Sequence, residues 1–265
     1  MVINDEWREA VARWDEWHLA GGGSSETLRL RHHYIGHLSA DHPDPWTVTT
    51  DDLIHFLARR GWAPETRKSA RSTVRSFYGW AQRVGIIEHS PAAALPSVRV
   101  PAGCPRPTPE QHVSEALDRA SQRDRLMVLL AAYAGLRRAE IAAIHRRSVR
   151  DDELVVRGKG ARWRVIPLHP RLTIALAAWP LDGYLFPGMI DGHISPGQVG
   201  RILSRLLGPG WTGHTLRHRF LSAAYAAERD IRAVQALAGH AKIDTTVRYT
   251  AVPAGALLRA VHAVA

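Results

Sequence analysis

Cysteine and long hydrophobic runs are scarce in this chain. Its 265 residues include one cysteine, Cys104, which excludes an internal disulfide framework and a cysteine-rich zinc site. The longest apolar runs, such as residues 126–134, fall far short of the ~20 residues that a membrane-spanning helix needs. Residues 1–10 are acidic and mixed and lack the apolar core of a signal peptide. The sequence therefore favours a cytoplasmic protein over a secreted, disulfide-stabilised one.

Lysine is also scarce, although the chain is strongly basic. Thirty-five Lys and Arg residues against 25 Asp and Glu residues give a formal net charge of +10. This excess predicts an anionic partner, most often nucleic acid; the alternative is that it only sets solubility. The lysines are Lys68, Lys159 and Lys242. Because lysine can lose its proton and arginine effectively cannot, a lysine kept in such a chain is a candidate proton donor.

Apolar periodicity predicts a mostly α fold with a small β-sheet, an α+β class. The first half is predicted to contain helices at 4–20, 25–39, 50–60 and 65–84. The second half is predicted to contain strands at 153–157 and 163–168 around a turn, and helices at 109–120, 123–134, from 138, 171–179, 196–207, 215–227, 231–238, 244–249 and 254–264. Between the halves, residues 90–109 are rich in proline and read as a semi-rigid linker containing Cys104.

Two helices of the first half carry distinctive faces. Trp7, Trp14 and Trp17 share one face of the first predicted helix, and we expect core packing rather than stacking on bases. The fourth helix carries a row of basic side chains four residues apart, with Lys68 beside it: Arg67, Arg71 and Arg75. Like charges at this spacing repel by a few tenths of a kcal/mol per pair, which a polyanion would relieve. We interpret the row as a DNA-binding surface; the alternative is a solvated basic face.

Two short motifs of the second half place arginine near another polar side chain. His214 and Arg217 lie three residues apart near a predicted helix start, a position suited to an anion. His214 and His218 also have the spacing of metal ligands, but this segment lacks a third ligand and an adjacent glutamate. Arg137 and Glu140 form either a simple ion pair or a carboxylate that orients a guanidinium toward a phosphate.

Two further residues are suited to covalent and proton-transfer chemistry. Lys159 lies between glycines at the tip of the predicted hairpin, where it is either an ordinary turn lysine or a general acid. Tyr249 lies on a short predicted helix that begins at Asp244, and it is either a core residue or a nucleophile toward phosphorus. Each of these residues is weak evidence alone.

Taken together and in this order, these residues resemble the active site of the tyrosine recombinase (phage integrase) family. The residues are Arg137, Lys159, His214-x-x-Arg217, His240 and Tyr249, within the strings Gly-Leu-Arg-x-x-Glu-Ile, Gly-Lys-Gly, His-x-Leu-Arg-His and Ala-Gly-His…Asp-Thr-Thr-x-Arg-Tyr-Thr. The motif resemblance covers about residues 108–250. It implies a helical, SAM-like core-binding domain at 1–98, a linker at 99–107 and a catalytic domain at 108–265. Nothing before residue 5 resembles an arm-binding domain, so we expect a minimal recombinase of the Xer or short-phage-integrase type.

The resemblance implies a role for each matched residue. Tyr249 would attack the scissile phosphate and form a 3′-phosphotyrosyl bond, and Lys159 would protonate the leaving 5′-oxygen. Arg137 and Arg217 would bind the nonbridging oxygens. His214 would help to deprotonate the tyrosine, His240 would hydrogen-bond the phosphate, and Glu140 would support a guanidinium. No metal, ATP or other cofactor is expected, because arginines neutralise the phosphate and the phosphotyrosine bond conserves energy.

The resemblance also implies partners. These are double-stranded DNA carrying a core recombination site, three further copies in a synaptic tetramer, and a directionality factor if the enzyme integrates mobile DNA. We expect no membrane partner and a cytoplasmic location on the nucleoid. The apolar segment 254–264 would dock on a neighbouring copy or pack on its own domain. The alternatives are a chromosome-dimer resolvase of the Xer type, a type IB topoisomerase, and a DNA-binding protein without catalysis.

Overall fold

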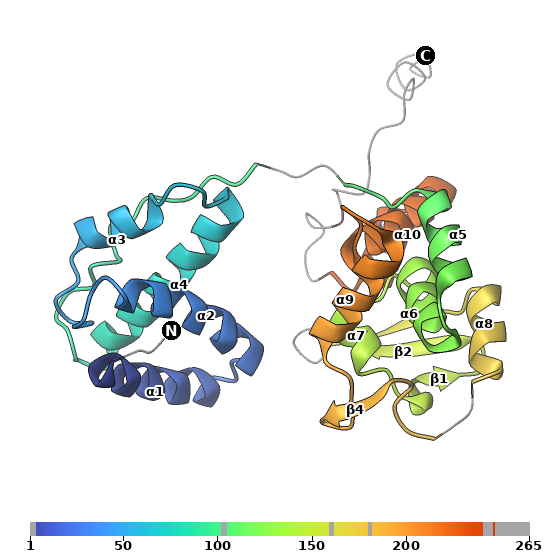
Figure 1. Cartoon of the computed structure of the whole chain (residues 1–265), viewed down its shortest axis with the longest axis horizontal. Coiled ribbons are helices and arrows are strands. Elements are labelled where there is room, and N and C mark those ends of the chain that lie inside the picture. The colour runs from blue at the N-terminus through green and yellow to red at the C-terminus, as the bar shows by residue number, and fades with distance from the viewer. Residues whose placement is uncertain (1–3, 102–104, 159–161, 180–181, 241–245, 247–265) are drawn as a thin grey trace, which may run out of the picture. The chain divides into compact units, whose positions relative to one another are not determined.

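A computed structural model describes residues 4–101, 105–158, 162–179, 182–240 and 246 (Figure 1). The chain divides into two compact units, Met1–Gly103 and Cys104–Ala265. Cys104, Lys159, Tyr249 and the predicted helix 254–264 lie outside the described residues. The expected mostly α fold with a small β-sheet is confirmed.

The first unit is built from helices whose starts follow local capping signals. The helices are α1 (Asp5–Ala20), α2 (Ser25–Ser39), α3 (Thr50–Leu57) and α4 (Pro64–Arg83). The side chain of Asn4 caps α1 and that of Ser24 caps α2. Thr49 and Asp52 form a reciprocal capping box at the start of α3. Pro64 begins α4, where its missing N–H costs nothing.

An aromatic cluster forms the core of the first unit. Phe77 of α4 stacks on Trp7 at 5.4 Å between ring centroids and meets the edge of Trp14 at 5.3 Å. Both tryptophans are fully buried, which confirms their expected place in the core. Trp17 is 39% exposed, so the prediction for this third tryptophan was wrong. It lies one turn beyond Trp14, where Arg83 covers its ring at 5.8 Å.

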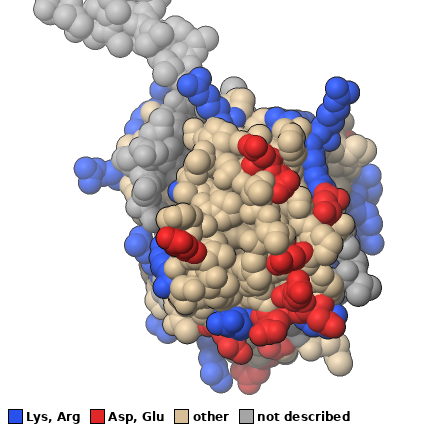
Figure 2. Space-filling model, turned by 90° about the vertical axis from the view of Figure 1, so that its left-hand side faces the viewer, with Lys and Arg blue, Asp and Glu red and all other residues tan. Residues whose placement is uncertain are grey.

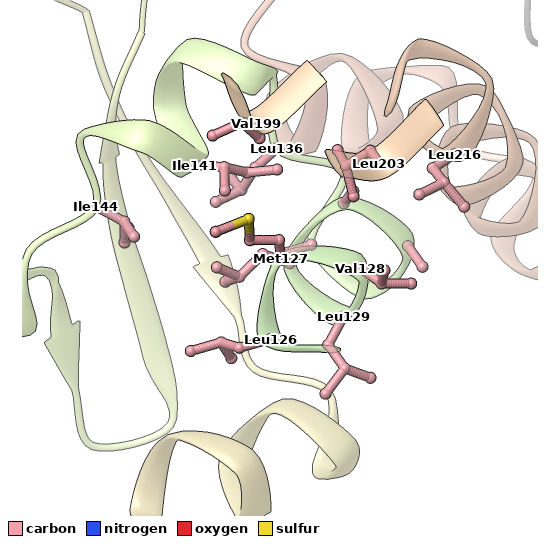
Figure 3. Close-up of a cluster of buried hydrophobic side chains, with 14 of the residues drawn as sticks. Leu126, Met127, Val128, Leu129, Leu136, Ile141, Ile144, Val199, Leu203 and Leu216 are labelled. Carbon is pink, nitrogen blue, oxygen red and sulfur yellow. The ribbon is translucent and has the colours of Figure 1, made fainter. Parts of the chain in front are cut away.

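The second unit surrounds one central helix. Its helices are α5 (Glu110–Arg119), α6 (Gln122–Tyr133), α7 (Arg138–Ala142), η1 (Arg146–Ser148), α8 (Pro170–Ala177), α9 (Pro196–Leu207), α10 (Gly213–Glu228) and α11 (Ile231–Ala238). Every residue from 126 to 132 is buried, because α6 packs against α5, α7, α8, α9 and α10. Figure 3 shows the side chains of α6 meeting Val199 and Leu203 of α9 and Leu216 of α10. A helix that is apolar on all sides is stable only in such a position.

A small antiparallel sheet forms one side of the second unit. Its order is β1 (Val149–Arg150), β2 (Glu153–Arg157) and β3 (Trp163–Pro167), with Leu154 opposite Ile166. The two strands of the hairpin were expected, whereas β1 and the separate β4 (Pro187–Ile190) were not. Strands of two to four residues are too short to show alternation in the sequence.

None of the described helices is both long and apolar enough to cross a bilayer. The face of the molecule in Figure 2 carries mostly uncharged side chains in its middle, acidic side chains that are scattered over it and gather toward its lower edge, and Lys and Arg mostly around its margins. The middle of this face is therefore not the basic surface that the net charge of +10 predicts.

Candidate active site

The first candidate residue, Arg137, lies immediately before α7, after a tight turn. Gly135 in this turn has φ of +60°, and a Cβ atom there would lie 2.3 Å from a ring carbon of Phe220, so only glycine fits. Glu140 accepts the backbone N–H of Arg137 and its Nη1, each at 2.8 Å. The turn therefore fixes both the backbone and the guanidinium of Arg137 at the surface of the unit.

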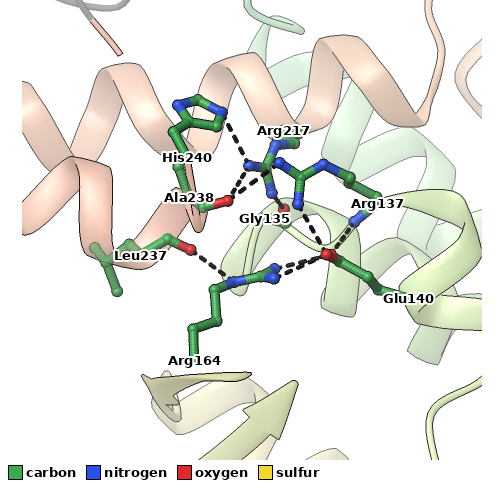
Figure 4. Close-up of polar contacts among 8 residues, drawn as sticks. All are labelled: Gly135, Arg137, Glu140, Arg164, Arg217, Leu237, Ala238 and His240. Atoms are coloured by element: carbon green, nitrogen blue, oxygen red, sulfur yellow. Dashed lines mark hydrogen bonds and ion pairs between the residues drawn. The ribbon is translucent and has the colours of Figure 1, made fainter. Parts of the chain in front are cut away.

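Glu140 holds a second guanidinium, which the sequence analysis did not single out. Arg164 of β3 donates Nη1 and Nη2 to the two carboxylate oxygens, each at 2.8 Å, in a bidentate pair (Figure 4). The side chains of Arg164 and Glu140 are 7% and 5% exposed. Two arginines thus share one buried carboxylate. The expected pairing of Glu140 with Arg137 is present, and it is one part of a larger arrangement.

The carboxyl group of Glu140 stays charged in this arrangement. Burial acts to raise its pKa, but the hydrogen bonds and charges of Arg164 and Arg137 outweigh burial and hold the pKa below its ordinary value. A charged carboxylate is the state that both guanidiniums require. Glu140 therefore remains an acceptor at neutral pH.

Arg217 of α10 is buried beside this cluster. It donates to the carbonyl oxygens of Gly135 and Ala238, each at 2.5 Å. Arg137 also donates to the carbonyl of Ala238, at 3.3 Å. Both predicted phosphate-binding arginines therefore meet at one carbonyl at the end of α11, where helix carbonyls carry partial negative charge (Figure 4).

His240 lies next to Arg217 and is held from its other side. Its Nε2 is 3.3 Å from Nη2 of Arg217, and its Nδ1 is 2.9 Å from the hydroxyl of Thr246. Because a guanidinium only donates, Nε2 accepts, and the proton of the neutral ring lies on Nδ1 and points to Thr246. Thr246 is fully buried and lies three positions before Tyr249 in the chain. Its contact with His240 was not predicted.

A second histidine pair lies at the start of α10. The backbone N–H of Arg106 donates to Nδ1 of His218 at 3.2 Å. Neutral His218 therefore carries its proton on Nε2, which lies 3.0 Å from Nε2 of His214. This contact pairs the two histidines that lie four residues apart on α10. Among the described residues, no group of three or more His, Cys, Asp or Glu side chains is arranged to hold a metal ion.

An open cleft borders Arg137, Arg217 and His214. Its volume is about 680 Å³, and it is lined by Arg137, Arg138, Gly197, Gly200, Arg201, Ser204, Thr212, Gly213, His214 and Arg217. Arg137, Arg164 and Arg217 carry three positive charges against the single charge of Glu140, an excess of two in this set. Arg137 and Arg217 of this set line the cleft together with Arg138 and Arg201, and such a group of positive charges favours an anion. The structure thus brings Arg137, Glu140, Arg217 and His240 together, with His214 on the wall of the cleft.

The remaining candidates are placed as follows. Lys159 and Tyr249 lie outside the described residues, so their assignments stay predictions. In the first unit, Arg71 donates to the carbonyl of Leu95 at 2.8 Å and Arg75 donates to that of Ala93 at 3.3 Å. The basic row was interpreted either as a DNA-binding surface or as a solvated face, and neither interpretation included these two contacts with backbone carbonyls. Arg67 is half-buried and Lys68 is exposed, and DNA binding by this row stays a prediction.

One signal for Arg164 was present in the sequence. Residues alternate between exposed and buried along β3, so Arg164 and Ile166 share the inner face. An arginine at an inward position of a strand needs a buried acceptor. The sequence did not indicate which of the many carboxylates supplies it.

Comparison with known proteins places the chain in a family. Residues 108–255 match the model described as the phage integrase family. The chain belongs to this family. As a phage integrase family member it is a tyrosine recombinase, an enzyme that cuts and rejoins DNA at specific sites.

Individual members of the phage integrase family show the same likeness. The tyrosine recombinase XerC of Rhodospirillum centenum is 33% identical over 94% of this chain and 84% of its own length. The solved integrase of mycobacterium phage Brujita is 29% identical, with a TM-score of 0.50 over 90% of this chain and 89% of that one. A lambda integrase dimer bound to a COC' core site is 20% identical with a TM-score of 0.71, over 91% and 76%, which shows the shared fold.

Proposed function

We propose that this recombinase integrates and excises a phage or another mobile element through a 3′-phosphotyrosyl intermediate. The observation that most strongly supports the phosphotyrosyl chemistry is the cluster in which Arg137 and Arg217 meet at the carbonyl of Ala238, beside His240. A phosphate between the two guanidiniums would be neutralised where its charge increases in the transition state. No metal ion is needed for that step, because the two arginines supply the positive charge.

The proposed mechanism assigns one role to each group. Tyr249 attacks the phosphorus atom, its proton passes toward His214, and the bond to the 5′-oxygen breaks as Lys159 donates a proton to it. Arg137 and Arg217 bind the nonbridging oxygens. The free 5′-hydroxyl of a second strand then attacks the phosphotyrosine, which restores the phosphodiester and the tyrosine without ATP.

The neutral form of His240 suits it to orienting Arg217. Its Nε2 accepts from the guanidinium, and its proton on Nδ1 is directed at Thr246. To donate to a phosphate oxygen through Nε2, the ring must carry a proton on that atom. The other neutral tautomer provides it, with Nδ1 accepting from the hydroxyl of Thr246.

The proposal includes partners. The substrate is double-stranded DNA with a core site, and strand exchange requires a tetramer, as in the lambda integrase tetramer bound to a Holliday junction, whose fold is similar (TM-score 0.68). The first unit would be a core-binding domain and the second the catalytic domain. We place the enzyme on the nucleoid in the cytoplasm, and we expect a directionality factor to favour excision.

The likeness to XerC over 94% of the chain supports a second candidate, a resolvase of chromosome dimers. The two candidates differ in the DNA site that becomes attached to the protein. An integrase would attach to the ends of a mobile element and its target, whereas a resolvase would attach to one chromosomal site.

The test is to recover DNA that stays attached to the protein after detergent denaturation of host cells, without a crosslinker. We compare the wild type with Tyr249→Phe and with Tyr184→Phe, a matched control that removes a hydroxyl away from the cleft. DNA recovered with the wild type and Tyr184→Phe but not with Tyr249→Phe supports the proposed intermediate, and its sequence identifies the site. Scattered sites would indicate a topoisomerase. Equal recovery with Tyr249→Phe would refute the nucleophile assignment.

A further inference from the structure

Arg164 contacts two separate elements of the proposed phosphate-binding site. Its Nη1 and Nη2 donate to Glu140 at 2.8 Å, and its Nε donates to the carbonyl of Leu237 at 3.0 Å (Figure 4). All of these partners lie on elements other than β3. The side chain is 7% exposed, so it does not reach solvent as an ordinary strand arginine does. It is a buried link between β3, α7 and the end of α11.

Arg137 and Arg217, the two arginines proposed to bind the phosphate, are called the clamp below. Each partner of Arg164 either holds one of these arginines or directly precedes a residue that does. Glu140 accepts both the backbone N–H and the guanidinium of Arg137. Leu237 is followed by Ala238, whose carbonyl accepts from both Arg137 and Arg217. A displacement of either partner therefore moves at least one of the two guanidiniums relative to the other.

We propose that Arg164 is a positioning residue for phosphate cleavage, which sets the spacing of Arg137 and Arg217 through Glu140 and the end of α11. The inference rests on the phosphate-binding roles proposed above for those two arginines. Arg164 does not touch the phosphate itself. It acts on the rate because the clamp stabilises charge best when both guanidiniums are already in place before the reaction.

The surroundings of Arg164 are shaped for an arginine. Gly239 has φ of +60°, and a Cβ atom there would lie 2.9 Å from Cδ of Arg164. A Cβ atom on Gly158 would lie 3.5 Å from Nη1 of Arg164 and 3.6 Å from Oε1 of Glu140. The missing Cβ at Gly239 therefore lets the backbone at the end of α11 approach the stem of Arg164, whereas a Cβ at Gly158 would make only ordinary van der Waals contacts with the ion pair. Lysine, with one nitrogen, cannot span both carboxylate oxygens and the carbonyl of Leu237.

A positioning role and a purely structural role of Arg164 predict different effects of its loss on cleavage kinetics. If Arg164 only stabilises the fold, its loss lowers the fraction of active protein but not the rate constant of that fraction. If it positions the clamp, its loss lowers the rate constant itself. That loss depends on the charge of the phosphate, because a neutral phosphate analogue has no charge for the clamp to stabilise.

The experiment measures single-turnover cleavage of DNA whose scissile group is either a phosphodiester or an uncharged methylphosphonate. The variants are Arg164→Met, which keeps the length and apolar character of the stem, and Arg162→Met, an exposed neighbour as control. On the phosphodiester we expect Arg164→Met to lower the rate constant about 10²-fold, the usual effect of losing a preorganised donor. On the methylphosphonate we expect the rate constant of Arg164→Met to lie less than about 10-fold below that of the wild type. Arg162→Met shows the same ratio on both substrates.

Several results would overturn the proposal. One is an Arg164→Met variant with reduced amplitude but a wild-type rate constant on the phosphodiester. Another is an equal loss of rate on both substrates. Should Arg164→Met not fold, Arg164→Lys provides the same comparison, since it keeps the charge but loses the bidentate geometry. Failure of the proposed function is distinguishable, because the wild type would then cleave neither substrate.

Discussion

Replacing Glu140 with Gln removes the charge that two arginines share while keeping the size of the side chain. The amide offers one acceptor oxygen where Arg164 and Arg137 use two, and its NH₂ group faces a donor. The guanidinium of Arg164, 7% exposed, is then a buried cation without its bidentate partner. Breaking a buried pair in this way costs about 3 kcal/mol or more, because the remaining charge stays desolvated.

The loss is measurable as a shift of the thermal midpoint. For a domain of the size of the second unit, about 3 kcal/mol lowers Tm by roughly 6–12 °C. The matched control is Asp124→Asn, which breaks the pair of Asp124 with Arg205 at 3.1 Å, where the arginine side chain is 70% exposed. A pair so exposed contributes about 0–1 kcal/mol, so we expect a fall of at most about 4 °C.

Differential scanning calorimetry of both variants, with cleavage assays alongside, tests this reasoning. We expect Glu140→Gln to lose cleavage as well, because the one remaining acceptor oxygen cannot hold both the backbone N–H and the guanidinium of Arg137. If Glu140→Gln melts no lower than Asp124→Asn, then the buried carboxylate does not stabilise the arginines, and the account of the site is wrong.

The remaining predictions concern pH, the glycine turn and the basic row. Because folding lowers the pKa of Glu140, the stability difference between the wild type and Glu140→Gln is complete above the ordinary pKa of 4.5 and shrinks as the pH falls below that value. Denaturation at several pH values measures this difference. A difference that does not change with pH contradicts the prediction. Gly135→Ala places a Cβ atom 2.3 Å from a ring carbon of Phe220, so we expect it to lower the free energy of unfolding, measured with denaturant, by about 1–3 kcal/mol. Gly200→Ala, within a helix and free of close contacts, is the control and is expected to raise that free energy by about 0.5–1 kcal/mol. Lys68→Ala and Arg71→Ala should each weaken DNA binding and lower the salt dependence of the affinity. Arg71→Ala should also lower the free energy of unfolding by about 1 kcal/mol, because its contact with the carbonyl of Leu95 is lost. If the salt dependence is unchanged in both variants, the basic row has only a structural role.

Much of the fold follows from local features of the sequence. Caps such as Asn4 and Ser24 begin helices because a side-chain oxygen satisfies N–H groups that the first turn leaves unpaired. Apolar periodicity predicted the helix α6, and the pattern of β-forming residues around a turn predicted β2 and β3. The three-residue spacing of His214 and Arg217 predicted a position suited to an anion, since residues three or four apart on a helix share a face.

Tertiary structure alone decided how those residues are held. Arg164 contacts Glu140 across 24 residues of sequence. The carbonyl of Ala238 accepts from Arg137 across 101 residues and from Arg217 across 21 residues. Backbone carbonyls are present at every position, and a sequence does not show which ones a buried guanidinium will find. Local periodicity places a side chain on a face of its own element, but only the packing of β3, α7, α10 and α11 determines what that face meets.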